Sequence, residues 1–304
     1  MNSRAVVFYS DFGQPTVLLA VALHSLERVF KGPIYVVLGQ EAPDWFETIL
    51  KRYSRIGTHR TKTTYPGATG RIHAYNVRAM VHKEIPFSTR VMFDADHVFI
   101  NPPDEQELFG YVERHGLGSY GFPITSLRGS GQSKAEAVAN EIRSLGLPCN
   151  TKLLQPSYGN CVGSVAGSED LIDFWLRHMD LFTKSKNRWL ASKFCDQHSL
   201  SYTMFVHNIP VGSWKCSYSG QQKSQKDINP PPPAFAIHFG HGRYAHAAAD
   251  HVYAKELAMV LQEDFMGMMT EIKRYNLAHP ALQEFCKARQ NAQIFSQAFA
   301  KLSQ

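Results

Sequence analysis

The chain has 304 residues, enough for one large α/β domain with an appendage or for two small domains. Hydrophobic residues make up 44% and charged residues 19%, which is the balance of an ordinary globular protein with a full core. The formal net charge of +6 favours acidic partners such as nucleotide phosphates, nucleic acid or an anionic membrane surface, but it does not choose among them.

The five cysteines argue against disulfides and zinc, because their number is odd and no two have CxxC spacing. The most apolar later stretch, Val17–Leu23, is closed by His24. It is too short for a membrane span, which needs roughly 20 apolar residues. With no targeting segment visible, these features favour a reduced protein in the cytoplasm of a bacterium or of a cell hosting a virus.

The first part of the chain alternates strand and helix signals. Strands are predicted where short apolar runs occur, and helices where apolar residues recur at helical spacing, the first of them beginning at Pro15. The predicted strands are 5–9, 34–38 and 90–93, and the predicted helices are 15–29, 45–53 and 74–81. Strand–helix–strand units of this kind imply a mainly parallel sheet covered by helices, with ligands outside the carboxyl ends of the strands.

The later part is more varied. Residues 109–121 look irregular, 130–146 read as an amphipathic helix or a mobile loop, and 169–182 predict a helix. The prolines of 229–233 indicate polyproline II leading into a short strand at 234–239. From about residue 250 the pattern is helical. We therefore expect a catalytic domain over 1–248 and a helical C-terminal extension over 249–304.

The strongest local feature is an apolar strand that ends in two carboxylates, Asp94 and Asp96. Buried carboxylates need a metal or strong hydrogen bonds. If the chain bends at Ala95, both carboxylates can bind one Mg²⁺ or Mn²⁺, ions that prefer oxygen ligands and share them with phosphates. A turn in which Asp94 caps the next segment is the simpler reading of this pattern alone.

Five further segments, in order along the chain, resemble those of the GT-A glycosyltransferases, specifically the retaining family 8-like branch. The resemblance covers residues 5–243 and rests on Val6–Asp11, Ala74–Ala79, Tyr158–Gly163, Asp196–Leu200 and Ala236–Gly240 together with the acidic strand end. It implies a GT-A fold, in which helices flank a Rossmann-like, mainly parallel sheet, with a helical C-terminal cap. It also implies a nucleotide-sugar donor, with a UDP-hexose expected, and Mn²⁺ or Mg²⁺ as the cofactor.

The resemblance also assigns residues to roles. His238 becomes the third metal ligand beside Asp94 and Asp96. The family's Lys after this His is missing, and Arg243 stands near its place and can bind pyrophosphate as a guanidinium. The implied donor-binding residues are Tyr9, Ser10, Asp11, Arg78, Asn160, Gly240, Gly242 and Arg243.

Asp196 and Gln197 are the implied catalytic pair. Asp196 would hold the hydroxyls of the donor sugar, and Gln197 would lie near the anomeric carbon. An amide is a poor nucleophile, so front-face substitution through an oxocarbenium-like state fits better than a covalent intermediate. The alternative role of Asp196 is that of a helix N-cap.

Three functions remain open. The first is transfer of a sugar to a hydroxyl on a saccharide or similar acceptor. The second is transfer to a 5-hydroxymethylpyrimidine in viral DNA, suggested by basic stretches that carry aromatic residues, Thr183–Trp189 and Trp214–Lys226. The third is an inactive nucleotide-sugar binding module, against which the intact Asp94, Asp96, Asp196 and His238 argue.

Overall fold

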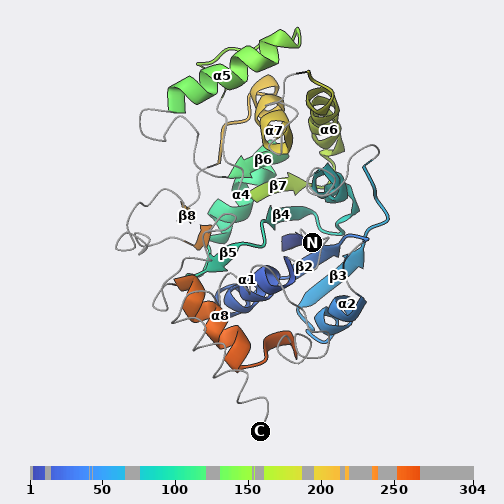
Figure 1. Cartoon of the computed structure of the whole chain (residues 1–304), viewed down its shortest axis with the longest axis vertical. Coiled ribbons are helices and arrows are strands. Elements are labelled where there is room, and N and C mark those ends of the chain that lie inside the picture. Colours follow the sequence, from blue (N-terminus) through green and yellow to red (C-terminus); the bar gives the residue numbers. More distant parts are fainter. Residues whose placement is uncertain are drawn as a thin grey trace. The chain divides into compact units, whose positions relative to one another are not determined.

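The computed structural model describes residues 3–10, 15–40, 42, 44–65, 76–120, 131–152, 154, 161–186, 195–212, 216–218, 235–238 and 252–267 (Figure 1). Its main sheet has six strands, is mainly parallel and has the order β3-β2-β1-β4-β7-β6. The strands are β1 (Arg4–Ser10), β2 (Ile34–Leu38), β3 (Ile56–Arg60), β4 (Thr89–Phe93), β6 (Leu117–Tyr120) and β7 (Cys161–Val165). β7 runs antiparallel to both β4 and β6. The mixed α/β fold predicted from the sequence is confirmed.

Burial explains why the inner strands read as continuous apolar runs. All five residues of β4 are buried, as expected for a strand covered on both faces. The one charged member, Arg90, is satisfied internally: its guanidinium donates to Ser164 Oγ at 2.8 Å and to the carbonyl of Ile85 at 2.9 Å. A buried charge in a strand is tolerated because it is fully hydrogen-bonded.

A second, three-stranded sheet has the order β5-β9-β8, formed by β5 (His97–Phe99), β9 (Ala236–His238) and β8 (Cys216–Tyr218). β5 and β9 are antiparallel, and their register places His97 directly opposite His238. The strand predicted at 234–239 is therefore present over the described residues 236–238, whereas β5 was not predicted. This pairing positions the candidate metal site.

The chain divides into two compact units. The first comprises residues 1–7, 60–93 and 104–214, and the second comprises residues 8–59, 94–103 and 215–304. The predicted boundary near residue 248 lies outside the described residues and stays a prediction.

In the first unit, α4 (Glu105–His115) packs against β4, β6 and β7. Asp104 caps it by accepting from the backbone N–H groups of Gln106 and Glu107 at 2.9 and 3.2 Å. The helix ends at Gly116, whose φ of 78° is a left-handed conformation that glycine adopts without strain. The expectation of an irregular segment over 109–121 was therefore wrong, since this region is the end of α4 followed by β6.

Three more helices belong to the first unit: α5 (Gly131–Ser144), α6 (Glu169–Thr183) and α7 (Cys195–Val206). Residues 130–146, read from sequence as a helix or a loop, are helical from 131 to 144. The three helices share a small hydrophobic core made of Val138, Ala139, Ile142, Leu154, Phe182 and Tyr202. Its members come from separate segments, so this core exists only in the folded chain.

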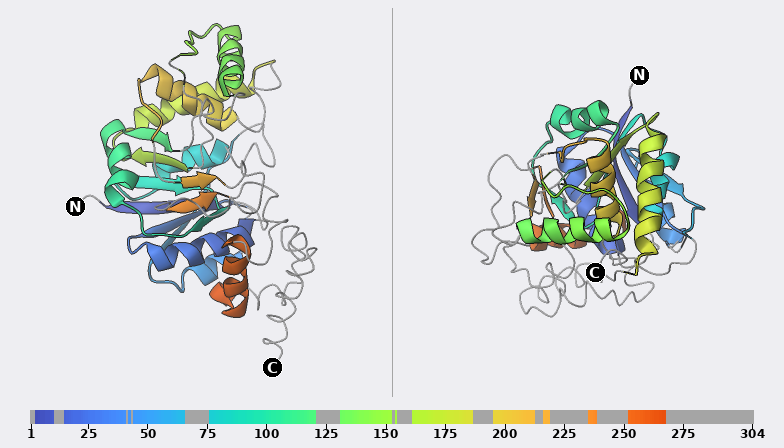
Figure 2. Two further views of the ribbon diagram at one scale, coloured as in Figure 1. Left: turned by 90° about the vertical axis from the view of Figure 1, so that its left-hand side faces the viewer. Right: turned by 90° about the horizontal axis from the view of Figure 1, so that it is seen from above.

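The second unit holds α1 (Pro15–Val29), α2 (Asp44–Leu50), α8 (Val252–Gln262) and a 3₁₀ turn at Phe265–Gly267. Pro15 is the first residue of α1, as predicted, because a first-turn proline loses no helical hydrogen bond. α1 packs against β5, and α8 lies beside α1 in both views (Figure 1, Figure 2). Among the helices that the structure describes, none is both long enough and apolar enough to span a membrane.

Candidate metal centre and donor-binding residues

The turn at residues 94–96 is closed by the first residue of β5. The ring nitrogen Nδ1 of His97 lies 2.7 Å from the backbone carbonyl oxygen of Asp94. A carbonyl can only accept, so Nδ1 carries the proton and donates. The bend at Ala95, which both carboxylates need in order to bind one ion, is therefore stabilised by the side chain of His97.

His238 faces both carboxylates of this turn. Its Nε2 lies 3.0 Å from Asp96 Oδ1 and 3.8 Å from Asp94 Oδ2. The side chains of Asp96 and His238 are 7% and 10% exposed, whereas that of Asp94 is 28% exposed. The structure thus brings the three predicted metal ligands together within one unit, with Asp94 at the more open side.

These three side chains fit a divalent cation. Two carboxylates and an imidazole are donors that Mn²⁺ accepts. Two ligands at right angles, each about 2.1 Å from an ion, are about 3 Å apart, which is the separation of the His238 and Asp96 atoms. The wider gap to Asp94 Oδ2, 3.8 Å, lies between that right-angle value and the value of about 4.2 Å for ligands on opposite sides of the ion.

The sequence analysis missed His97, which the structure places inside this cluster. Asp96, His97 and His238 each offer a ligand atom, and these atoms lie within 4.8 Å of one another. The rings of His97 and His238 stack with centroids 4.6 Å apart and planes 29° apart. The one signal for His97 in the sequence was its position directly after the second carboxylate. Its contact with His238 depends on a strand pairing that no local pattern reveals.

Two predicted donor-binding residues, Tyr9 and Ser10, end β1. Ser10 is buried, and its backbone carbonyl accepts from the N–H of Gly39 at 2.7 Å. Their contact with the base of a donor stays a prediction. The remaining members of the set, apart from Arg78, lie outside the described residues: Asp11, Asn160, Gly240, Gly242 and Arg243.

In the first unit, the segment carrying Arg78 lies next to the predicted catalytic pair. Residues 76–80 are helical and Arg78 is buried. Cys195 Sγ, at the start of α7, donates to Asn76 Oδ1 at 3.9 Å, a sulfur–oxygen contact that joins this helix to α7. Burial raises the pKa of Cys195 to about 12, with the neighbouring Asp196 carboxylate adding to the effect, so the thiol stays protonated. Cys195 is therefore a structural donor and not a nucleophile.

Asp196 and Gln197 are the second and third residues of α7. The helix begins at Cys195, so Asp196 stands in the first turn and is not the N-cap. A carboxylate there is stabilised by the helix dipole. Trp175 Nε1 donates to the Asp196 carbonyl at 3.0 Å and to Ser199 Oγ at 3.1 Å. This indole fixes the start of α7 against α6 and hence the position of Asp196.

No protein-family model matches the chain, and no curated protein is similar to it in sequence. Among solved structures, the bifunctional glycosyltransferase WbbM has a TM-score of 0.59 at 10% identity over 85% of this chain. This chain spans about half of WbbM, 49% of its length. An active-site mutant of LgtC has a TM-score of 0.51 at 12% identity, covering 84% of this chain and 94% of LgtC.

The galactosyltransferase LgtC in complex with donor and acceptor sugar analogues is also found, with a TM-score of 0.49 at 10% identity, covering 87% of this chain and 95% of LgtC. At such low identities the likeness to WbbM and to the LgtC mutant concerns the arrangement of the backbone. The chain has the GT-A fold of these glycosyltransferases.

Proposed function

We propose that the protein is a metal-dependent glycosyltransferase that moves a sugar from a nucleotide-sugar donor to a hydroxyl acceptor. The observation that carries this proposal is that His238 Nε2 faces both carboxylates of the Asp94–Asp96 turn, at 3.8 and 3.0 Å. A largely buried cluster of two acids and an imidazole has the ligand chemistry of a divalent-cation site. The fold that the chain shares with the glycosyltransferases WbbM and LgtC also supports this proposal.

Asp94, Asp96 and His238 would hold Mn²⁺ or Mg²⁺. When bound, the cation would neutralise charge on the diphosphate of the donor as it departs. The two carboxylates bind the ion and transfer no proton. Arg243, in place of the family's Lys, would add positive charge at the leaving group, and the resemblance gives Arg78 the role of a donor contact. A UDP-hexose is the proposed donor.

In the transfer step, the bond between the anomeric carbon and the diphosphate oxygen breaks and its electron pair stays on the diphosphate. The acceptor oxygen bonds to the same carbon, and its proton passes to an oxygen of the departing diphosphate. Asp196 would hold the sugar hydroxyls, supported by Trp175, and Gln197 would lie near the anomeric carbon. Because no carboxylate is assigned as a nucleophile, we propose front-face substitution with retention of configuration.

We propose a saccharide or a similar hydroxyl compound as the acceptor. The alternative acceptor is hydroxymethylated DNA, suggested by the basic stretches 183–189 and 214–226, and parallel acceptor assays separate the two.

The proposal is tested by measuring divalent-ion binding and release of the nucleoside diphosphate from UDP-sugars, with saccharide, lipid and hydroxymethylated DNA acceptors in parallel. Asp94→Asn and Asp96→Asn should lower turnover at least about 100-fold, since the ion supplies several kcal/mol. Asp170→Asn, which changes an exposed carboxylate on α6, is the matched control and should retain activity. Full turnover in EDTA would contradict the metal assignment.

A further inference from the structure

His97 shares the candidate metal cluster with Asp96 and His238, and two roles are open to it. It can donate a nitrogen to the ion, or it can hold the ligands in place. Its side chain is completely buried at the first position of β5. The hydrogen bond and the ring contacts of the imidazole support the second role, and the number of histidine nitrogens on the bound ion separates the two.

The hydrogen bond excludes one of the two ring nitrogens of His97 as a ligand. The His97 nitrogen that lies 4.0 Å from Asp96 Oδ1 is Nδ1. The same nitrogen donates to the Asp94 carbonyl at 2.7 Å, so its lone pair is replaced by a proton. Nδ1 therefore cannot bind a cation, and Nε2 is the ring nitrogen that keeps a lone pair, since a histidine that binds a metal commonly donates its other N–H to a carbonyl. The bond spans the turn and fixes the backbone between the two carboxylates.

The ring contacts also point to support. The register of β5 and β9 sets His97 opposite His238, and the two rings stack at 4.6 Å. The ring of His97 also contacts that of Phe99, with centroids 6.1 Å apart and planes 26° apart. Phe99 contacts Phe235 at 5.0 Å and Phe8 at 6.1 Å. These contacts join the buried imidazole of His97 to an aromatic cluster of the second unit.

We infer that His97 is a positioning residue of the metal site: its Nδ1–H holds the Asp94–Asp96 turn closed, and its ring holds the imidazole of His238 toward both carboxylates. This inference rests on the proposed metal-dependent function. Groups of this kind orient ligands, and their loss lowers metal affinity by about 10–100-fold. The metal is therefore held by a site that is preformed before the ion arrives.

The test uses the full chain and Mn²⁺ alone as the probe. His97→Phe keeps a ring and removes the donor, whereas His97→Asn keeps an N–H near the place of Nδ1 and removes the ring. Val98→Ala trims the neighbouring buried residue of β5 and controls for general loosening of the strand. We expect the Mn²⁺ dissociation constant to rise about 10–100-fold in His97→Phe and less in His97→Asn, with little change in Val98→Ala.

Two spectroscopic readouts separate positioning from ligation. Pulsed electron paramagnetic resonance of bound Mn²⁺ should show one coordinated histidine nitrogen, retained in His97→Asn and lost in His238→Asn. Two nitrogens in the wild type and one in His97→Asn would make His97 a ligand and overturn the inference. Without metal, ¹⁵N spectra of labelled histidine at pH 8 should show the proton of His97 on Nδ1; a proton on Nε2 instead would also overturn it.

The failures of the two proposals are distinguishable. Tight Mn²⁺ binding by the wild type, with equal affinity in His97→Phe, would refute the role of His97 and leave the proposed function standing. Absence of Mn²⁺ and Mg²⁺ binding by the wild type would refute the metal-dependent function, and the inference with it.

Discussion

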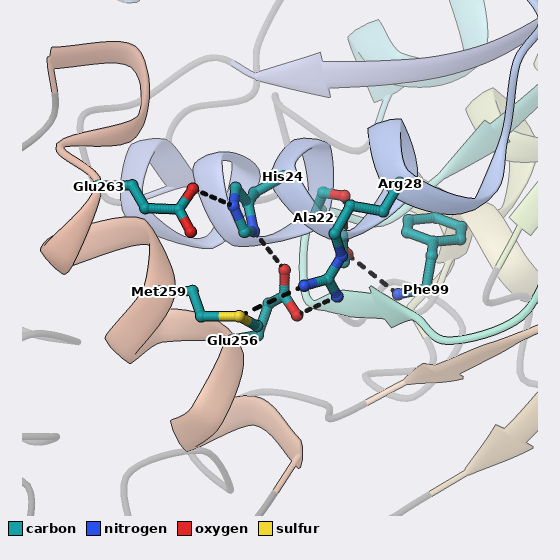
Figure 3. Close-up of polar contacts among 8 residues, drawn as sticks. Ala22, His24, Arg28, Phe99, Glu256, Met259 and Glu263 are labelled. Atoms are coloured by element: carbon teal, nitrogen blue, oxygen red, sulfur yellow. Dashed lines mark hydrogen bonds and ion pairs between the residues drawn. The ribbon is translucent and has the colours of Figure 1, made fainter.

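The contact between α1 and α8 includes an ion cluster centred on His24 (Figure 3). Nδ1 of His24 is hydrogen-bonded to Glu256 Oε1, and Nε2 lies 3.1 Å from Glu263 Oε2. Carboxylates only accept, so a ring that bonds both carries two protons and a positive charge. Arg28 Nη2 donates to the other oxygen of Glu256 at 2.6 Å. Two positive and two negative charges therefore balance across the two helices.

His24→Phe is the informative change, because phenylalanine keeps the edge contact with the ring of Phe265, whose centroid lies 4.8 Å from that of His24. Glu256 is 3% exposed and would lose one of its two charged partners, which costs about 1.5–3 kcal/mol for a charge-assisted hydrogen bond. Glu263 is 60% exposed, so its ion pair contributes no more than about 1 kcal/mol. The loss should therefore come almost wholly from Glu256.

The cluster should also make docking of α8 dependent on pH. Burial lowers the pKa of His24, but its hydrogen bonds to Glu256 and Glu263 outweigh burial and raise the pKa above the ordinary value of 6.5. The folded pKa exceeds the unfolded one, so this stabilisation is fully present below pH 6.5 and is lost as the pH rises through the raised value. His24→Phe should abolish that dependence.

Docking of α8 is measured by hydrogen exchange of the 252–262 backbone at pH 6 and pH 9, corrected for the intrinsic exchange rates. Urea unfolding gives the free energy of unfolding. Glu263→Gln is the matched control and should cost less than about 1 kcal/mol. Equal protection of α8 in His24→Phe and the wild type, or an equal loss in Glu263→Gln, would refute the reasoning.

Three further predictions concern the first unit and the chemistry. Burial lowers the pKa of His198 and of His178 to about 4, below the ordinary 6.5. The unfolded state therefore binds more protons, and the free energy of unfolding of the unit should fall as the pH drops from 6.5 toward 4. Urea unfolding at several pH values measures this loss. Asp104→Ala removes the cap of α4 and should lower the free energy of unfolding by about 1 kcal/mol, while a cap-retaining Asp104→Asn should restore most of it. Proton NMR of the transfer product should show the anomeric configuration of the donor retained; inversion would contradict the roles proposed for Asp196 and Gln197.

Local sequence determined several parts of this protein. The apolar runs at 34–38 and 90–93 form strands, and Pro15 begins a helix. At these places the residues that determine burial and backbone geometry are neighbours in the sequence, so a local pattern is enough to predict the structure. The acidic turn after β4 was recognisable for the same reason: two carboxylates one residue apart interrupt an apolar run. α4 was missed although Asp104 and Glu107 form a capping pattern and the buried Leu108, Phe109, Tyr111 and Val112 follow at helical spacing.

Only the tertiary structure decided the surroundings of the candidate site. β5 has three residues, too few for a periodic signal, and it exists because it pairs with β9, far away in the sequence. That pairing stacks the ring of His97 on the ring of His238. The hydrogen bond from His97 to the carbonyl of Asp94 then joins the acidic turn to the same cluster. The link from Cys195 to Asn76 and the ion cluster of His24 likewise join distant segments. Such contacts form when burial of the whole core brings the strands and helices together, so no local pattern of residues could predict them.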